Sequence, residues 1–307
     1  MRTREQEAEQ LVSLADIAEI ELLFLKRVRS LVPGEHRSMA EGTGFDFVGI
    51  RPWQSGDRFS SIDWAQSSLQ NFAPLMVREF DQASASRVVV VADRSASTWC
   101  GTDGQLVAAV HARAIATIGL SAVFFQDAFG LITFDAGIRS LQAVAPRIGK
   151  GQVVRCLSAY QDGHGTQELL RAPRLSDTIG GYLRQTSFVP FISDFLFDEP
   201  RTVLAELALL AATHDVVVVL VDCAFAFNVP AVSAGWIRVA DVETGQRRLV
   251  KRSTLVKLQE HVREWQDSVE FMARDLDLEV LRLGADEAAS TLALAEFVAE
   301  RRLRKLG

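Results

Sequence analysis

The stretch VVVVADRSAST, residues 88–98, decides the fold of this chain. Its four valines and one alanine form an unbroken apolar run, which is typical of a strand buried on both faces of a parallel sheet. The run ends at Asp93, and hydroxyl groups follow at Ser95 and Ser97. These polar residues have three open interpretations: ligands of a metal ion, a nucleophile site, or caps of the next helix.

Similar apolar runs recur after this strand and alternate with helical patterns. Besides residues 88–92, strands are predicted at residues 128–134, 188–192, 216–221, 236–239 and 278–281. Helices are predicted at residues 104–125, 151–160, 168–185, 200–213, 255–275 and 287–304. This alternation predicts an α/β fold with a doubly wound, mostly parallel sheet that is covered by helices on both faces.

The chain before the first of these strands has a different pattern. Apolar residues at three- and four-residue spacings predict an amphipathic helix that ends at Pro33 and packs against the main domain. From Gly34 onward, glycine and proline interrupt short apolar segments, which indicates a β-rich extension. The predicted organisation is a helix at 1–33, the extension at 34–84 and the α/β domain at 85–307.

Composition and charge narrow the function classes. The chain has 307 residues, of which 48% are hydrophobic and 23% charged, and its net charge of −6 comes without a basic stripe, so nucleic acid is not expected as a partner. The cysteines Cys100, Cys156 and Cys223 are far apart in sequence, which favours free thiols in a reducing compartment. No signal-peptide core or run of about 20 apolar residues is evident, so we expect a cytoplasmic protein without a membrane span.

Polar side chains gather where the predicted strands end. Asp93, Ser95 and Ser97 follow the first strand, Thr166 ends the loop GHGT at residues 163–166, and Asp194 follows the strand FVPFIS. Ligands of such sheets bind beyond the carboxyl ends of the strands, so these loops are expected to meet. Their oxygen atoms suit Mg²⁺ or Mn²⁺, and an ion with so few carboxylates keeps an open coordination position that a partner's acidic residue could fill. Helix capping by Asp93 and the serines stays open beside the metal hypothesis.

Two patterns here match known families. The order DxSxS, a glycine–threonine loop and a strand-end aspartate is similar to the metal-ion-dependent adhesion site of von Willebrand factor A-type domains. Upstream, GFDFVGIRPWQSGDRFSSIDWAQSSL at residues 44–69 resembles the signature of the bacterial domain of unknown function 58, and FISDF and VADVETG continue the resemblance. The signature positions are Arg51, Gly56, Asp57, Asp63 and Trp64. Ser60, Ser61 and Leu69 stand where that family often has arginines.

The resemblance implies a von Willebrand factor A-like sheet with a β-rich insertion. Members of the family are typically encoded beside MoxR-type AAA+ ATPases, so it also implies a non-enzymatic adaptor or chaperone-like assembly factor. Such a protein acts with the ATPase in the maturation or activation of a client protein. For Arg51, Asp57, Asp63 and Trp64 we expect a structural role, as a buried arginine–carboxylate network with the tryptophan packed beneath it.

A metal- or serine-dependent hydrolase is the alternative function. Ser95 or Ser97 would be its nucleophile and His164 the base nearest in the predicted site. The sequence lacks the GxSxG motif of the nucleophile elbow. A nucleotide site is not favoured, because the chain has neither GxxxxGK[ST] nor GxGxxG after a strand.

Overall fold

The chain divides into two compact units in a computed structural model. One unit comprises Met1–Leu31 together with Ser86–Gly307, and the other is Val32–Ala85. The structure describes residues 10–31, 46–54, 62, 64–69, 71–81, 86–102, 105–135, 138, 140–228, 235–240 and 246–306. The signature positions Gly56, Asp57 and Asp63 lie outside these described residues.

A seven-stranded sheet forms the centre of the larger unit, and the strand predicted from the valine run is β3 (Arg87–Asp93). The strand order is β13-β10-β9-β3-β6-β7-β8. The other strands are β6 (Ala128–Phe134), β7 (Leu141–Arg147), β8 (Gln167–Glu168), β9 (Phe188–Ser193), β10 (Asp215–Val221) and β13 (Glu279–Leu283). All neighbours from β13 to β6 are parallel, whereas β7 and β8 add antiparallel strands at one edge. The predicted α/β class and mostly parallel sheet are therefore confirmed.

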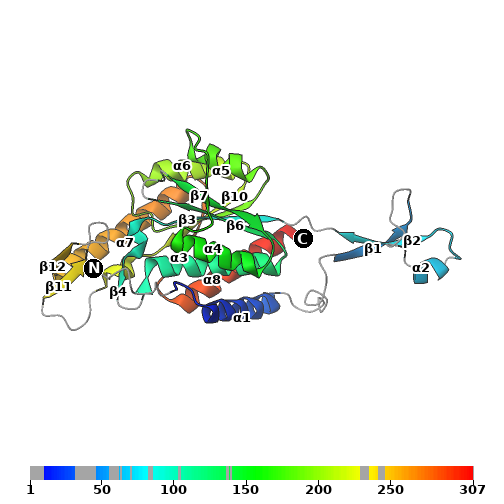
Figure 1. Ribbon diagram of the computed structural model, residues 1–307, viewed down its shortest axis with the longest axis horizontal. Coiled ribbons are helices and arrows are strands. Elements are labelled where there is room, and N and C mark those ends of the chain that lie inside the picture. Colours follow the sequence, from blue (N-terminus) through cyan, green and yellow to red (C-terminus); the bar gives the residue numbers. More distant parts are fainter. Residues whose placement is uncertain are drawn as a thin grey trace. The chain divides into compact units, whose positions relative to one another are not determined.

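Helices cover both faces of this sheet. Successive β3 side chains point to opposite faces, so its valines make both faces apolar. Val88 and Val90 belong to the core on one side, with α3 (Val107–Phe124), α4 (Lys150–Asp162) and α8 (Glu287–Leu306). Val89 and Val91 belong to the core on the other side. That second layer contains α5 (Leu175–Leu183), α6 (Pro200–Ala211) and the later turns of α7 (Arg252–Asp275). Figure 1 shows α5 and α6 on one side of the sheet and α3 and α4 on the other.

Helix α3 lies at the centre of the first layer. Among the described helices it alone has the length and apolar composition of a membrane span, and most of its residues are buried inside the fold. A Cβ atom added at Gly119 would lie 2.9 Å from the Phe129 ring, so the close approach of α3 to β6 depends on this glycine. Helix α1 (Leu14–Leu31) begins at a reciprocal cap between Ser13 and Asp16.

Two predicted elements differ from the structure. The segment at residues 236–239 was expected among the alternating strands, but β11 (Trp236–Ala240) pairs only with β12 (Arg247–Lys251) in a separate antiparallel hairpin. Its alternation of exposed and half-buried residues suits a hairpin with one solvated face and not a sheet covered on both sides. The helix expected at 168–185 is shorter, because Pro173 precedes α5 and the chain before it forms β8.

The smaller unit contains β1 (Asp46–Pro52) paired antiparallel with β2 (Met76–Asp81), and the short helix α2 (Trp64–Leu69). Ile62 and Ser67 are buried here, and the Ser67 hydroxyl accepts a hydrogen bond from the Met76 backbone amide at 2.8 Å. Trp64 is 57% exposed, so the prediction that it packs beneath a buried network is wrong. The short helix turns Ser67 inward, and its first residue, Trp64, remains at the surface.

The aromatic side chain of Phe191 gives a direct test of the core. Phe191 is fully buried in β9, and its ring stacks on Phe134 at a centroid distance of 5.1 Å. Replacing it with alanine is expected to lower the free energy of unfolding by about 3–5 kcal/mol, because the buried ring is lost and the surrounding core relaxes only partly into the cavity. Urea unfolding measures the change. The matched control is Phe271→Ala, where the ring is 73% exposed and an effect within about 0.5 kcal/mol is expected.

Candidate metal centre at the carboxyl edge of the sheet

Asp93 lies at the carboxyl end of β3 and is only 1% exposed; two hydrogen bonds hold its carboxylate and a third holds its backbone. Its Oδ1 accepts a hydrogen bond from the Ser95 backbone amide at 2.9 Å. Its Oδ2 accepts one from the Ser193 hydroxyl, at the end of β9, at 2.8 Å. The Tyr160 hydroxyl, from α4, donates to the Asp93 backbone carbonyl at 2.9 Å. The carboxylate is therefore held in one orientation, as a buried charge requires.

The two serines are free of the capping role that the sequence left open. Ser95 precedes the short 3₁₀ helix η2 (Ala96–Trp99) and makes no side-chain cap bond, because the Asp93 carboxylate holds that turn instead. The Ser95 and Ser97 hydroxyl oxygens lie 2.9 Å apart, and both residues are half-buried. The capping role and a ligand-binding role can therefore coexist. Asp93 stabilises the turn, and the Ser95 and Ser97 hydroxyl oxygens lie side by side.

Asp194 follows β9 and carries the unusual feature of the site. The residue is 1% exposed; its Oδ1 accepts a hydrogen bond from the Leu196 amide at 3.0 Å, but its Oδ2 is buried without a hydrogen-bond partner. Burial, and next the nearby Asp93 carboxylate, raise the pKa of Asp194 to about 7. A buried carboxylate oxygen without a donor is costly, so this atom favours a proton or a cation.

The later turns of α7 fix the loop that carries Asp194. The Gln266 side-chain amide donates to the carbonyl oxygens of Asp194 at 3.0 Å and Val221 at 2.8 Å, and the Trp265 indole donates to the Phe195 carbonyl at 2.9 Å. Gln266 was not predicted as a site residue, although it is fully buried between Val262 and Val269. A glutamine in the apolar stripe of a helix is the sequence signal that could have revealed it.

His111, on α3, is the second polar residue near Asp93 that the sequence did not single out. Its Nδ1 lies 3.1 Å from the Val107 carbonyl, which can only accept, so this nitrogen carries the proton. Its Nε2 is buried without a partner. Burial lowers the pKa of His111 to about 4, and the Asp93 carboxylate opposes that shift only in part. The imidazole is therefore neutral at physiological pH.

Thr166 lies in the neighbouring loop, and among the described residues no hydrogen bond joins it to Asp93, Ser95, Ser97 or Asp194. Its hydroxyl is within hydrogen-bond distance of the Gln142 side-chain carbonyl and, at 3.0 Å, of the Gly163 backbone carbonyl. The Arg94 side chain, from the loop after β3, packs against Gly163 in the loop of Thr166. It lies so close that a Cβ atom added at Gly163 would be 2.6 Å from the Arg94 Nη1. Gly163 also has a φ of +74°, so glycine is needed there for both reasons.

The alternative function, in its serine-dependent form, needs a base within hydrogen-bond reach of a serine. His164 is exposed in the loop after α4. Across the described part of the chain, no histidine forms a hydrogen bond with Ser95 or Ser97, whose hydroxyls pair with each other. The contacts therefore give a serine nucleophile no activating partner.

The donor set fits a hard divalent cation. The structure brings together Asp93, Ser95 and Ser97. The Asp93 carboxylate is also near enough to Asp194 to raise its pKa. Within the described ranges no group of three or more histidine, cysteine or acidic residues could hold a metal ion. An ion here would therefore rest on two carboxylates, hydroxyl oxygens and water, a set that suits Mg²⁺ or Mn²⁺ and not Zn²⁺.

Comparison with protein families gives one match. The model of a family described as "Protein of unknown function DUF58" matches residues 49–267, which include β3, η2 and the loops of Thr166 and Asp194. No curated protein matches the chain.

The solved structures that match this chain have low sequence identities and TM-scores below 0.5. The conserved hypothetical protein BatB from Bacteroides thetaiotaomicron has 13% sequence identity and a TM-score of 0.42, over 72% of this chain and 99% of that one. An aerotolerance-related membrane protein from Bacteroides fragilis has 12% identity and a TM-score of 0.39, over 70% and 99% of the two chains. The pilus adhesin SpaC from Lactobacillus rhamnosus GG has 10% identity and a TM-score of 0.39, over 72% and 31%.

The raised pKa of Asp194 makes a prediction about stability without metal. In the folded protein Asp194 keeps its proton up to about pH 7, whereas in the unfolded chain it releases it near about pH 3.9. The folded state then binds more protons between these values, so this residue's contribution to stability falls as the pH rises through the window. Urea unfolding in EDTA at about pH 5 and about pH 8 is expected to show a loss for the wild type that Asp194→Asn lacks, by more than about 1 kcal/mol.

His111 makes an opposite contribution to the pH dependence of stability, and comparing the wild type with Asp194→Asn cancels it. Its folded pKa is lowered, so its contribution to stability rises between about pH 4 and about pH 6.5. Both proteins retain His111, and only the difference between their pH profiles reports on Asp194. Identical profiles for the wild type and Asp194→Asn would contradict the assignment.

Proposed function

The chain belongs to the DUF58 family of proteins of unknown function, and we propose that it is a cytoplasmic, non-enzymatic adaptor that binds an acidic residue of a partner protein through Mg²⁺ or Mn²⁺. The observation that carries the proposal is the buried Oδ2 of Asp194, which has no hydrogen-bond partner and lies near the Asp93 carboxylate. Two buried carboxylates destabilise each other's charged form, and a divalent cation would relieve both the repulsion and the missing bond.

A von Willebrand factor A-like sheet with a metal-ion-dependent adhesion site is part of this proposal. Its support is the placement of the DxSxS motif at the end of β3, between parallel neighbours β9 and β6, with antiparallel β7 beyond β6. Asp194 ends the adjacent strand, and the loop of Thr166 approaches through Arg94 and Gly163. Three loops at one edge of the sheet can thus contribute oxygen atoms.

Each proposed ligand has a defined part. Asp93 is positioned by Ser193 and Tyr160, and Ser95 and Ser97 offer neighbouring hydroxyl oxygens. Asp194 supplies the unpartnered carboxylate oxygen. Thr166 completes the proposed set, although its hydroxyl lies within hydrogen-bond distance of the Gln142 side-chain carbonyl and the Gly163 backbone carbonyl. The bound ion would supply an open coordination position for a carboxylate oxygen of the partner.

The proposed partners follow from the family resemblance. They are a MoxR-type AAA+ ATPase and a client protein that presents an aspartate or glutamate, with maturation or activation of the client as the result. For the serine-dependent form of the hydrolase alternative, the described residues offer no activating base, since the serine hydroxyls pair with each other and His111 is held by Val107. The metal-dependent form stays an alternative.

Calorimetry tests the metal site. Mg²⁺ and Mn²⁺ are expected to give binding heat with the wild type and none with Asp93→Ala, because that change removes the central ligand. The matched control is Asp222→Ala. Asp222 follows β10 and holds its own turn through a hydrogen bond from the Ala224 amide at 2.9 Å, so it tests the loss of a strand-end turn without the metal site. Absence of heat in the wild type, or equal heat in Asp93→Ala, would overturn the site.

A pull-down from the source cell tests the adaptor function. The tagged protein is expected to retain an AAA+ ATPase or one defined client in Mg²⁺ and to lose it in EDTA, because the coordination bond needs the ion. Asp93→Ala should lose the same partner in Mg²⁺, whereas Asp222→Ala should keep it. Retention of the partner by Asp93→Ala would separate partner binding from the metal and contradict the proposal.

A further inference from the structure

The β11–β12 hairpin has two different faces. Cross-strand pairing places Trp236 opposite Lys251 and Arg238 opposite Leu249 on one face. Trp236 and Leu249 are 56% and 64% exposed there, and Arg238, Arg247 and Lys251 are exposed beside them. We call these residues the basic hairpin face: Trp236, Arg238, Arg247, Leu249 and Lys251.

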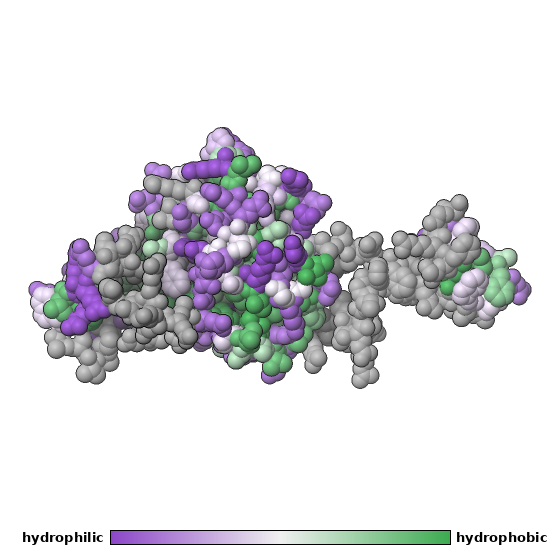
Figure 2. Space-filling view, in the orientation of Figure 1, coloured by the Kyte–Doolittle hydropathy of each residue, from purple (hydrophilic) through white to green (hydrophobic). Residues whose placement is uncertain are grey.

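The opposite face explains why these side chains are exposed. Ile237, Val239 and Val250 point to that other face and are partly buried. Alternate residues of a strand lie on opposite faces, so burying this apolar set turns the basic hairpin face toward solvent. Figure 2 shows hydrophilic and hydrophobic side chains side by side over this hairpin.

The charges of the basic hairpin face are available to a partner. Within the part of the chain that the structure describes, Arg238, Arg247 and Lys251 form no ion pair. Lys251 lies over the Trp236 ring at 5.6 Å from its centroid, a contact that leaves its charge uncompensated. The whole chain has a net charge of −6, so three grouped cations beside an exposed tryptophan and leucine form a local exception.

Helix α7 connects this face to the candidate metal centre. Its first residue, Arg252, donates its backbone amide to the Gly235 carbonyl at 2.9 Å, which joins the hairpin to the helix. Farther along, Gln259 donates to the Ala224 carbonyl at 3.1 Å, and Gln266 donates to that of Asp194. From Arg252 to Gln266 the helix rises about 21 Å, a span that an extended segment of about seven residues covers.

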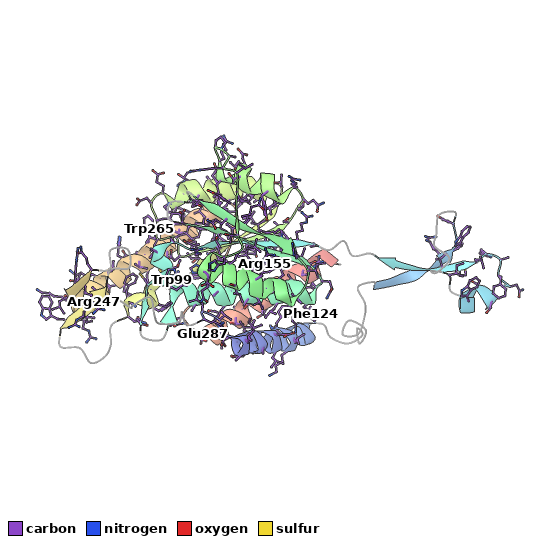
Figure 3. The ribbon with its side chains drawn as sticks, viewed as in Figure 1. Trp99, Phe124, Arg155, Arg247, Trp265 and Glu287 are labelled. Atoms are coloured by element: carbon purple, nitrogen blue, oxygen red, sulfur yellow. The ribbon has the colours of Figure 1, made fainter. Side chains whose placement is uncertain are left out.

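An exposed aromatic ring follows the serines of the candidate site. Trp99 ends η2, two residues after Ser97, and is 37% exposed. In Figure 3, Trp99 lies toward the end of the domain that carries Arg247, and Phe124 lies toward the other end. The hairpin and the Asp93 cluster therefore belong to the same end of the larger unit.

We infer that the basic hairpin face binds an acidic, extended segment of the partner protein and directs one of its carboxylates to the Asp93–Asp194 site. The second half of this inference rests on the proposed metal function, whereas binding of the acidic segment to the hairpin does not. Charge complementarity selects the segment: a partner that presents a carboxylate to the site also meets three cations at the other end of this part of α7, about 21 Å away. Trp236 and Leu249 add apolar contact area to the electrostatic attraction.

The direct probe is a fluorescent poly-glutamate peptide of about ten residues, with binding measured by anisotropy in EDTA at low salt. The variant Arg238→Glu/Arg247→Glu/Lys251→Glu is expected to weaken binding by about tenfold or more, since each exposed charge pair contributes a few-fold and salt screens it. Arg247→Glu and Arg248→Glu form a matched pair, because they are adjacent residues on opposite faces. Arg247→Glu is expected to weaken binding several-fold more than Arg248→Glu.

A remote control and a second probe complete the test. Arg147 is exposed at the end of β7, at the opposite edge of the sheet, so Arg147→Glu should leave peptide binding unchanged. Equal binding by the wild type and the triple variant would overturn the inference. Binding of the wild type to vesicles with anionic phospholipid, but not to the peptide, would overturn it in favour of a membrane surface.

The two proposals fail separately. Asp93→Ala is expected to lose the Mg²⁺ heat and to keep peptide binding in EDTA, because its hairpin is unchanged. The triple hairpin variant is expected to keep the Mg²⁺ heat and to lose peptide binding. A triple variant that binds the peptide like the wild type sinks the hairpin inference alone.

Discussion

Two carboxylates buried at one edge of an apolar sheet, Asp93 and Asp194, are the constraint on which the rest of this structure depends. A buried charge is costly unless hydrogen bonds or an opposite charge compensate it. The fold compensates Asp93 with the Ser95 amide and the Ser193 hydroxyl, and it leaves one oxygen of Asp194 without compensation. An unpartnered aspartate at position 194 costs stability that an asparagine or an apolar residue would not, which supports the proposed ligand-binding role.

The surrounding elements are built to keep these two groups in place. Gln266 occupies a position in the apolar stripe of α7 and donates to the carbonyls of Asp194, just after β9, and Val221, the last residue of β10. These bonds tie the Asp194 loop to the helix. His111 stays neutral because it is fully buried, so it adds no positive charge that would compete with a cation. The polar groups around the site therefore position the carboxylates and do not neutralise them.

The sequence predicted the sheet better than the site. Valine-rich runs specify buried parallel strands by their composition, and β3, β6, β9, β10 and β13 lie close to their predicted positions. The antiparallel edge strands β7 and β8 were not predicted. The hairpin segment at residues 236–239 was assigned to the same sheet because a short apolar run has no feature that identifies its pairing partner. Asp93, Ser95 and Ser97 share one turn and could be predicted together. The contacts of Ser193, Tyr160 and Gln266 join residues far apart in sequence, and no local spacing encodes them.

Helix α7 links the basic hairpin face to the Asp194 loop. One end of the helix carries the basic hairpin face, and its later turns hold the backbone of the Asp194 loop. A partner bound at the hairpin would therefore contact the same helix that positions Asp194, about 21 Å farther along it. A short acidic segment could reach both places without a conformational change, since a continuous helix of 24 residues fixes the distance between them. Electrostatic attraction at the hairpin would then raise the local concentration of the carboxylate at the site, as two linked contacts do in any bivalent interaction.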